Sequence, residues 1–221
     1  AVGVACATGT TWIGDDAPLT TDDVIIATTC GNVVTIGATA ICAGVTINTG
    51  AILTATTFGL TVNGPWQNDG TYNHGTTSTV TFGGLTAAIN AGAGTANFRN
   101  ISIASGTSLA INTPVTTAGT FVFVTPATTT NSIVTLTGTN TLEVGGAMTI
   151  ARPTSNTYTC TFDIGAGTLT VLGTFTMSAT TSTRYSVLSL STGTANFNGV
   201  PTGTTGCLIN FSDAGTTNIS G

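Results

Sequence analysis

The feature that most constrains the fold of this chain is a set of short, strand-like segments that recur along it. Residues 94–98 read GTANF, and the same five letters return at residues 193–197. Three similar segments lie between these copies, and the leading threonines recur at intervals of roughly 20–30 residues, a length typical of solenoid repeats. Such a repeat predicts stacked structural units that share one core. The leading threonines are Thr95, Thr120, Thr141, Thr168 and Thr194.

Each repeat has room for three short strands. A second strand-like segment follows after one or two glycines at residues 147–150 and 174–177, and a third precedes the next unit at residues 160–165 and 186–190. Three strands per repeat predict one coil of a right-handed parallel β-helix, with about eight or nine coils in the chain. No segment carries a helical period, so almost no helix is expected. A β-sandwich is the alternative, but it predicts strand spacings of about 8–12 residues without a longer period.

Alternation within the segments predicts which side chains face the core. Leu142 and Val144 are expected to point inward and Glu143 outward, because successive residues of a strand face opposite sides. By the same alternation Asp163 points to solvent from between two apolar neighbours. The acidic side chains are therefore expected on the surface.

Composition narrows the class of protein. The chain holds 54 threonines and 29 glycines, 41% of its residues are hydrophobic, and only 5% are charged. Threonine suits a pleated sheet and glycine suits the turns, while a disordered chain would be charged and poor in apolar residues. A net charge of −5 with no lysine argues against nucleic acid, whose phosphates require clustered cations.

The chain is expected to contain an N-terminal segment, residues 1–20, that acts as a cap or an inter-subunit strand, followed by a solenoid domain over residues 21–221. It starts at Ala1 without a basic and apolar leader. We expect a mature N-terminus left by signal-peptide removal, and hence a secreted protein. An arbitrary boundary is the alternative.

A family resemblance rests on the first half of the chain. The segments TDDVII at 21–26, VVTI at 33–36 and VTI at 45–47 are followed by LTVNGPWQNDGTYN at 60–73 and TVTFGG at 79–84. This succession resembles the repeats of bacterial cell-surface β-helix proteins, the adhesin-like and filamentous-haemagglutinin-like group. The resemblance implies export and a surface setting, but no particular partner, since such repeats occur in proteins whose partners vary.

Some β-helix proteins degrade polysaccharides, which requires two carboxylates across a substrate. Glu143 and Asp163 lie on nearby predicted strands, with Arg152 between them, and His74 is the single histidine. Scarce cations make a lyase groove hard to build. We expect these side chains to be solvating surface or loop residues, the protein not to be an enzyme, and no cofactor to be bound.

Two further groups of residues are candidates for binding. Four aspartates near the N-terminus can supply oxygen ligands to calcium, although no known calcium-loop pattern is present and aspartates also shape turns. Three aromatic residues can form a sugar-stacking platform, or can pack in the first coils. The aspartates are Asp15, Asp16, Asp22 and Asp23, and the aromatic residues are Trp12, Trp66 and Tyr72.

The cysteines show no metal-ligand spacing. In a secreted chain they are disulfide candidates, with Cys30–Cys42 or Cys6–Cys30 as possible pairs. The alternative is that they are buried as small apolar residues. An odd number leaves at least one thiol free or intermolecular. The five are Cys6, Cys30, Cys42, Cys160 and Cys207.

Threonine pairs of the form Thr-x-Thr raise the possibility of ice binding. A flat ladder needs one pair at the same place on every coil, whereas these pairs fall on different predicted strands and the coil lengths vary. The pattern therefore argues against ice binding. The pairs begin at Thr79, Thr135, Thr159, Thr168 and Thr174.

The two ends of the chain suggest self-assembly. The last residues stop in strand-like sequence, while the first five are small and apolar, and open strand edges invite pairing. Head-to-tail stacking of copies predicts a filament or surface layer. The alternatives are an adhesin or carbohydrate-binding module that recognises cell-surface glycans, and a secreted polysaccharide-active enzyme. The expected assembly residues are Ala1, Val2, Val4, Cys6, Phe211 and Ile219.

Overall fold

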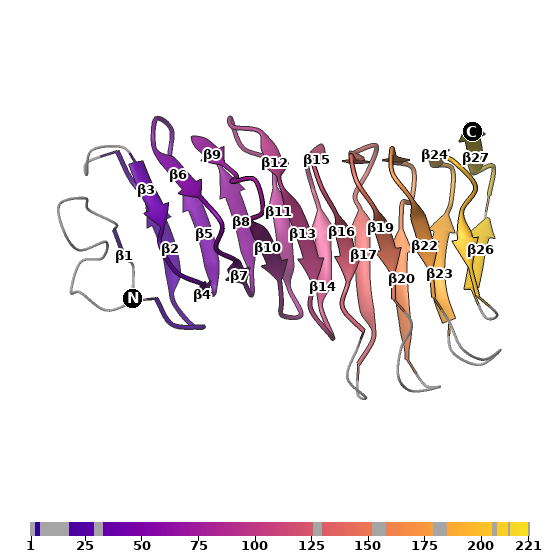
Figure 1. The fold of residues 1–221 in the computed structure, drawn as a ribbon, viewed down its shortest axis with the longest axis horizontal. Coiled ribbons are helices and arrows are strands. Elements are labelled where there is room, and N and C mark those ends of the chain that lie inside the picture. The colour runs from indigo at the N-terminus through magenta and orange to yellow at the C-terminus, as the bar shows by residue number, and fades with distance from the viewer. Residues whose placement is uncertain are drawn as a thin grey trace.

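The computed structural model describes residues 3–4, 18–28, 33–125, 130–151, 158–178, 185–204, 207–211 and 213–220. Over these ranges the regular secondary structure consists of β-strands without any helix, so no described helix is available to cross a membrane. The strands stack into one elongated body with the two termini at opposite ends (Figure 1). The predicted parallel β-solenoid is confirmed, with about eight turns.

Each full coil contributes one strand to each side of the solenoid, and every pairing between strands is parallel. One side is a ten-stranded sheet. Its strands are β1 (Gly3–Val4), β2 (Asp23–Ile26), β5 (Gly44–Ile47), β8 (Pro65–Asn68), β11 (Ala87–Asn90), β14 (Ser108–Ile111), β17 (Ser132–Leu136), β20 (Thr159–Asp163), β23 (Tyr185–Leu190) and β26 (Cys207–Phe211).

The second side of the solenoid is an eight-stranded sheet. Its strands are β4 (Ala40–Cys42), β7 (Leu60–Val62), β10 (Thr79–Phe82), β13 (Asn100–Ile103), β16 (Phe121–Phe123), β19 (Met148–Ile150), β22 (Phe175–Met177) and β25 (Thr202–Gly203).

The remaining strands form two shorter sheets, a three-stranded sheet in the early coils and a six-stranded sheet in the later ones. The first holds β3 (Val33–Ile36), β6 (Ile52–Ala55) and β9 (Thr71–Asn73). The second holds β12 (Ala96–Phe98), β15 (Val115–Thr117), β18 (Thr141–Val144), β21 (Thr168–Val171), β24 (Thr194–Asn198) and β27 (Thr216–Ser220).

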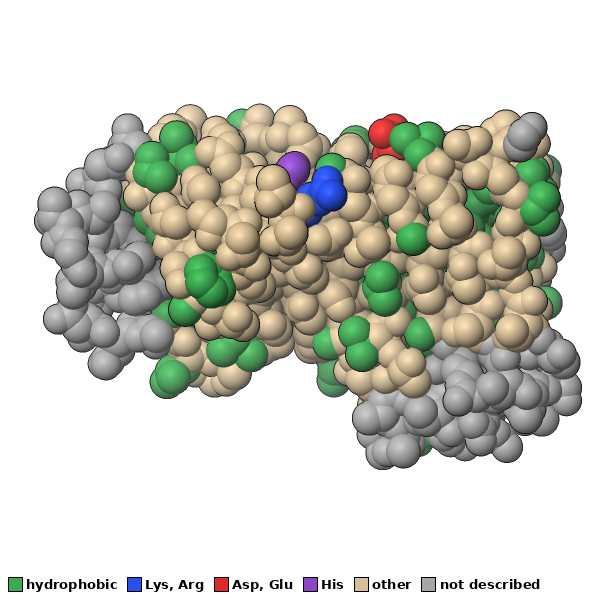
Figure 2. Space-filling model, in the orientation of Figure 1, with side chains coloured by type: hydrophobic (Ala, Val, Ile, Leu, Met, Phe, Trp, Pro, Cys, Tyr) green, Lys and Arg blue, Asp and Glu red, His purple; other side chains and the backbone are tan. Residues whose placement is uncertain are grey.

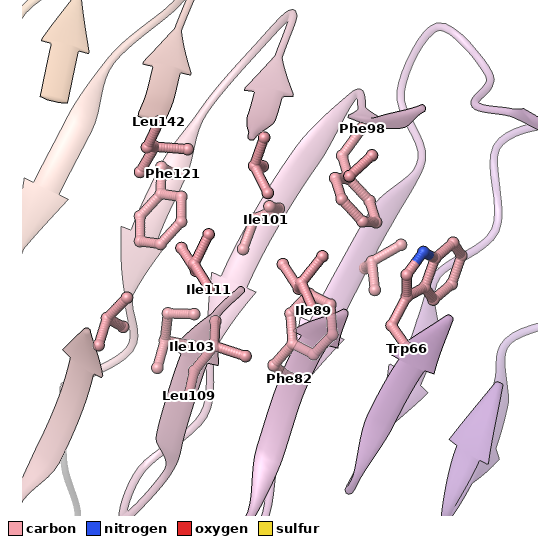
Figure 3. Packing of buried hydrophobic residues seen from close by; sticks show 14 of the residues in the cluster. Trp66, Phe82, Ile89, Phe98, Ile101, Ile103, Leu109, Ile111, Phe121 and Leu142 are labelled. Atoms are coloured by element: carbon pink, nitrogen blue, oxygen red, sulfur yellow. The ribbon is translucent and has the colours of Figure 1, made fainter. Parts of the chain in front are cut away.

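The core fills the space that the sheets enclose. Leu142, Val144 and Phe162 are fully buried, while Glu143 is exposed and Asp163 partly exposed, so the predicted alternation is confirmed. Aromatic rings bridge neighbouring coils: the ring centroids of Phe98 and Trp66 are 5.2 Å apart. Figure 3 shows this packing of aromatic and aliphatic side chains between the strands. Because no coil covers its own apolar side chains, stacking stabilises all of them together.

The sequence predicts that the five leading threonines occupy equivalent places in successive coils, and this is wrong for one of them. Four of the five leading threonines precede or begin strands of the six-stranded sheet, but Thr120 precedes β16 in the eight-stranded sheet. The six-stranded sheet takes Val115–Thr117 from that coil instead. This strand reads VTT and turns the hydroxyl of Thr117 inward, so it lacks the apolar alternation that marks the other copies.

The connections that lead from the eight-stranded sheet into the ten-stranded sheet vary most in length. Ala43 alone separates β4 from β5, and residues 63–64 separate β7 from β8. Later in the chain, residues 124–131, 151–158 and 178–184 fill the same position. Coil length therefore varies at one corner while the sheets keep their pairing.

Candidate functional site

The two carboxylates considered for glycoside hydrolysis do not form a pair. Glu143 lies on β18 in the six-stranded sheet, whereas Asp163 ends β20 in the ten-stranded sheet. The Asp163 Oδ1 atom accepts a hydrogen bond of 3.1 Å from the Gly165 amide, which fixes the following turn. Arg152 lies outside the described residues. These contacts give Asp163 a local structural role.

The single histidine is engaged with its own loop. The Nδ1 atom of His74 is 3.2 Å from the carbonyl oxygen of Gly75, and no described serine or carboxylate is hydrogen-bonded to the ring. A nucleophile activated by this histidine would need such a contact.

Of the two alternatives for the aromatic residues, packing in the early coils is confirmed for the two that the structure describes, and these two form no surface platform. Trp66 is fully buried and Tyr72 nearly so, with ring centroids 4.9 Å apart. Burial raises the pKa of Tyr72 to about 12. Both rings pack in the core because the apolar interior of a coil needs large side chains to fill it. Trp12 lies outside the described residues.

The described aspartates near the N-terminus shape a turn. The Oδ2 atom of Asp22 accepts a hydrogen bond of 3.0 Å from the Leu19 amide, and this bond holds the pKa of Asp22 below its usual value. Within the described ranges no three His, Cys, Asp or Glu side chains come together as metal ligands. Asp23 begins β2, and Asp15 and Asp16 lie outside the described residues.

The described cysteines are free thiols, so the disulfide expectation is wrong for Cys42, Cys160 and Cys207. Cys42 and Cys160 are fully buried as small core residues, and burial raises the pKa of each thiol to about 12. The Cys207 thiol donates to the carbonyl oxygen of Met177 at 3.2 Å. Cys6 and Cys30 lie outside the described residues.

The first coil holds an apolar hollow of about 500 Å³. Its walls are inward-facing side chains of β2, β3 and β4 together with the turn at residues 37–39, backed by the next coil. The side chains that define it include Val24, Ile26, Val34, Ile36, Cys42 and Val45.

The last coil exposes apolar side chains at the opposite end. Leu208 on β26 is 45% exposed and Ile219 on β27 is 53% exposed, although Ile219 occupies the register position of the buried Phe197. No described strand pairs with the outer edges of β26 and β27. Phe211 ends β26 in register with Leu190. The predicted assembly residues Phe211 and Ile219 therefore both lie on the terminal coil.

The N-terminal strand continues the ten-stranded sheet. Gly3 and Val4 pair in parallel with Val24 and Ile25 of β2. Val24 also pairs with Val45 of the next coil. The number of residues from Gly3 to Val24 equals the number from Val24 to Val45. β1 thus stands where the strand of a preceding coil would stand. Ala1, Val2 and Cys6 lie outside the described residues.

One surface feature escaped the sequence analysis. In the eight-stranded sheet, one outward register position carries a hydroxyl on six of eight strands, and we call these side chains the hydroxyl column. Figure 2 shows that charged side chains are few on one face of the molecule. The members of the column are Thr61, Thr81, Ser102, Thr149, Thr176 and Thr202, with Ile41 and Val122 at the two other positions.

Comparison of the chain with family models, with curated proteins and with solved structures found no match. The resemblance to cell-surface β-helix repeats thus remains a resemblance in sequence pattern, and the fold itself is what the structure establishes.

Proposed function

We propose that this chain is a non-enzymatic structural subunit of an extracellular filament or surface layer, in which copies stack head to tail. The observation that carries the proposal is the ten-stranded sheet. It starts at β1 and ends at β26, all its pairings are parallel, and no described strand covers the outer edge of either. An open edge presents unpaired N–H and C=O groups that pair readily with another chain.

The register of the sheet defines how two copies would join. Phe211 pairs with Leu190 in the last coil, and Gly3 pairs with Val24 in the first. If the sheet continues in the same register, Phe211 of one copy stands beside Gly3 of the next. Strand addition of this kind gains main-chain hydrogen bonds and aligns side-chain positions at the same time. Because the contact is heterologous and continues the sheet along the axis of the solenoid, copies would add without closing into a ring.

Apolar surface at the two ends supports the same joint. The first coil has the apolar hollow, and the last coil exposes Leu208 and Ile219. Stacking of the last coil on the first would cover Ile219, which stands at the inward register position of Phe197, a gain of roughly 25 cal/mol per Å² of apolar surface removed from water.

Charge at the ends opposes assembly at low ionic strength. Asp22 and Asp23 lie in the first coil, and Asp213 lies between the last two strands. Salt screens repulsion between exposed charges over about 10 Å at 0.1 M. Assembly is therefore expected to increase with salt concentration.

The setting and the alternative function rest on the sequence resemblance. Residues 21–84, which resemble adhesin-like repeats, cover strands β2 to β10 and thus three consecutive coils. This supports a secreted protein at a cell surface. An adhesin that binds glycans is the second candidate, favoured by the many outward hydroxyls and weakened by the burial of Trp66 and Tyr72, which leaves those rings unable to stack on sugar.

The test is the size of the protein in solution, measured by light scattering and electron microscopy. The full chain should form polymers, and a variant that lacks residues 1–11 should remain monomeric at the same concentration. Cys6→Ser is the matched control, because it removes the thiol and keeps the strand. A full chain that stays monomeric at high concentration and high salt contradicts the filament. Polymers that survive the deletion keep the filament and exclude β1 from the joint.

A further inference from the structure

The hydroxyl column is a regular array because strand pairing sets its interval. Thr61 pairs with Thr81, and Thr81 pairs with Ser102. After Val122 the series resumes with Thr149, Thr176 and Thr202 in adjacent register. Neighbouring strands lie about 4.7–4.9 Å apart. Hydroxyl groups therefore recur at that interval along one line of the sheet.

The array has a rigid support. On the strands from β7 to β22 the residues on both sides of the column position point inward and are buried, among them Val80, Phe82, Phe121, Phe123 and Phe175. Each inner strand is paired on both edges, which leaves the backbone little freedom. Threonine is β-branched and restricted in χ1, so its hydroxyl and methyl groups keep fixed directions.

Four of the six hydroxyls are available to a ligand. Thr61, Thr81, Ser102 and Thr149 are partly exposed, and none of their hydroxyls is hydrogen-bonded to another group in the described part of the chain. The other two are engaged: the hydroxyl oxygens of Thr176 and Thr202 are 3.2 Å apart, and the Thr202 hydroxyl donates to the carbonyl oxygen of Phe175 at 3.3 Å. No column position carries a charged side chain.

The composition of the column selects the class of ligand. Protein partners bind through clustered aromatic and large apolar anchors, and the column offers only Ile41 and Val122. Sugar rings stack on aromatic faces, and no column position is aromatic. A neutral, rigid and periodic row of methyl and hydroxyl groups matches a ligand that is itself a periodic lattice of hydrogen-bonding oxygens. Ordered water has this chemistry, and its oxygen repeat in ice is close to the spacing of paired strands.

We propose that the hydroxyl column of the eight-stranded sheet is an ice-binding face, in which threonine methyl groups order the adjacent water and the hydroxyls join its lattice. The Thr-x-Thr pairs visible in the sequence did not reveal it, because they fall on three different sheets: Thr79 and Thr174 on the eight-stranded sheet, Thr135 and Thr159 on the ten-stranded sheet, and Thr168 on the six-stranded sheet. Only Thr81 and Thr176 of the column belong to these five pairs, and coil stacking brings them into line with four residues outside the pairs.

The six-stranded sheet provides the internal comparison. It also aligns outward threonines, at Thr141, Thr168, Thr194 and Thr216. Its neighbouring outward position, however, holds Glu143 and two amides, of which Asn218 donates to Asn196 at 2.8 Å. Since an amide, Asn100, also lies beside the hydroxyl column, the feature that distinguishes the six-stranded sheet is the carboxylate of Glu143, whose charge interrupts a water lattice. The six-stranded sheet is therefore the control face.

The experiment compares bulky substitutions on the two faces. The full chain should slow ice recrystallisation and should partition into a growing ice front. The double variant Thr81→Tyr with Thr149→Tyr should lose both effects, because the rings project above the row. The matched double variant Thr168→Tyr with Thr194→Tyr should retain them. Circular dichroism and melting temperature must show that both variants remain folded.

Three results would overturn the proposal. The first is a full chain that behaves toward ice like an inert protein at equal concentration. The second is loss of ice binding in the control variant but not in the column variant. The third is binding of the full chain to crystalline cellulose or chitin, lost in the column variant, without any effect on ice; this would assign the face to a polysaccharide. None of these results depends on whether copies stack end to end.

Discussion

The early and later coils of this solenoid form the same parallel strand pairs, but the later coils contain more residues per coil. In the ten-stranded sheet Val24 pairs with Val45 in the early coils, and Thr135 pairs with the more distant Asp163 in the later ones. The later coils take more chain because residues 124–131, 151–158 and 178–184 separate strands of the eight-stranded sheet from the next strands of the ten-stranded sheet, whereas Ala43 alone does so in the first coil. Strand pairing and coil length are therefore independent, and only the pairing is constrained by the core.

At this corner, between the eight-stranded and the ten-stranded sheets, the early and later coils also differ in the side chains that face inward. In the later coils the strands of the ten-stranded sheet begin earlier, and Ser132, Cys160 and Ser186 face inward in one register. The Ser186 Oγ atom donates to the carbonyl oxygens of Ala151 and Ser178, at 3.1 and 2.6 Å. Small polar residues thus satisfy backbone groups where the longer connections leave the sheets.

The largest effect is expected from the aromatic cluster of the early coils. Phe98 contacts Trp66, Tyr72 and Phe82, with ring centroids 5.2, 5.7 and 6.1 Å apart. Phe98→Ala should lower the free energy of unfolding by about 3–5 kcal/mol, and Phe98→Leu by less, because leucine leaves a smaller cavity. Urea denaturation measures both.

The later cluster tests whether the two halves unfold together. Phe162 contacts Phe121 and Phe123, with ring centroids 5.8 and 6.4 Å apart. Phe162→Ala should cause a loss of similar size to that of Phe98→Ala, about 3–5 kcal/mol. A single transition is expected in both variants if stacking couples all coils. Two transitions in either variant would separate the halves into independent cooperative units.

A smaller but clear loss is expected at a stack of glycines. A Cβ atom on Gly173 would overlap the carbonyl oxygen of Gly146, which itself lies against Gly119 in the coil before. Gly173→Ala should destabilise the fold by more than about 1 kcal/mol. Gly37 faces open space, so Gly37→Ala is the control and should leave the melting temperature unchanged or slightly raised.

The buried thiol of the later corner should make stability depend on alkaline pH. Burial raises the pKa of Cys160 to about 12, so its contribution is complete below the ordinary thiol pKa and is lost as pH rises toward 12. Cys160→Ser should cost about 1 kcal/mol at neutral pH. Burial raises the pKa of Cys42 in the same way. The Cys160→Ser variant should therefore still lose stability at alkaline pH, but less than the unsubstituted chain. Melting temperatures from pH 7 to 11 measure this, and an unchanged pH profile would contradict it.

The longer connections themselves should matter little. A variant that lacks residues 153–156 shortens one connection, and loop closure changes by only about 0.6 kcal/mol for a doubling of length. The melting temperature should therefore stay close to that of the full chain. A large loss would show that the added residues take part in the fold.

The smallest effect is expected for the acidic side chains. Glu143→Gln combined with Asp163→Asn should change the free energy of unfolding by no more than about 0.5 kcal/mol, because both side chains point outward. Assembly should also be unchanged. Loss of a measured polysaccharide-degrading activity in this double variant would instead support an enzyme.

Much of the fold follows from the sequence because its signals are local. Alternation in segments such as residues 141–144 and 160–164 assigns their inward faces, and a repeat longer than the strand spacing of a sandwich distinguishes a solenoid from that fold. The alignment of coils is not local. The connection at one corner ranges from Ala43 alone to the whole of residues 124–131, so equivalent positions drift out of phase, and Thr120 was matched to the wrong sheet.

Variable coil length is also the reason why the hydroxyl column could not be predicted from the sequence. Its members, from Thr61 through Thr81, Ser102, Thr149 and Thr176 to Thr202, are separated by unequal lengths of chain, and Val122 interrupts the series. No fixed period in the sequence connects them. The burial of Trp66 and Cys42 was also undecided from sequence, because it depends on neighbouring coils that the local pattern does not specify.

The one-coil offset of every strand pair has a mechanical consequence. Each strand inside a sheet pairs with one strand from the coil before and one from the coil after, so a force applied between the ends meets the coils in series. Peeling one coil releases a repeat of chain whose extended length is roughly 70–100 Å, at about 3.3–3.6 Å per residue. The released length differs between coils, because the corner connections differ. A stretched molecule should therefore lengthen in steps, and the size of each step should identify which coil has opened.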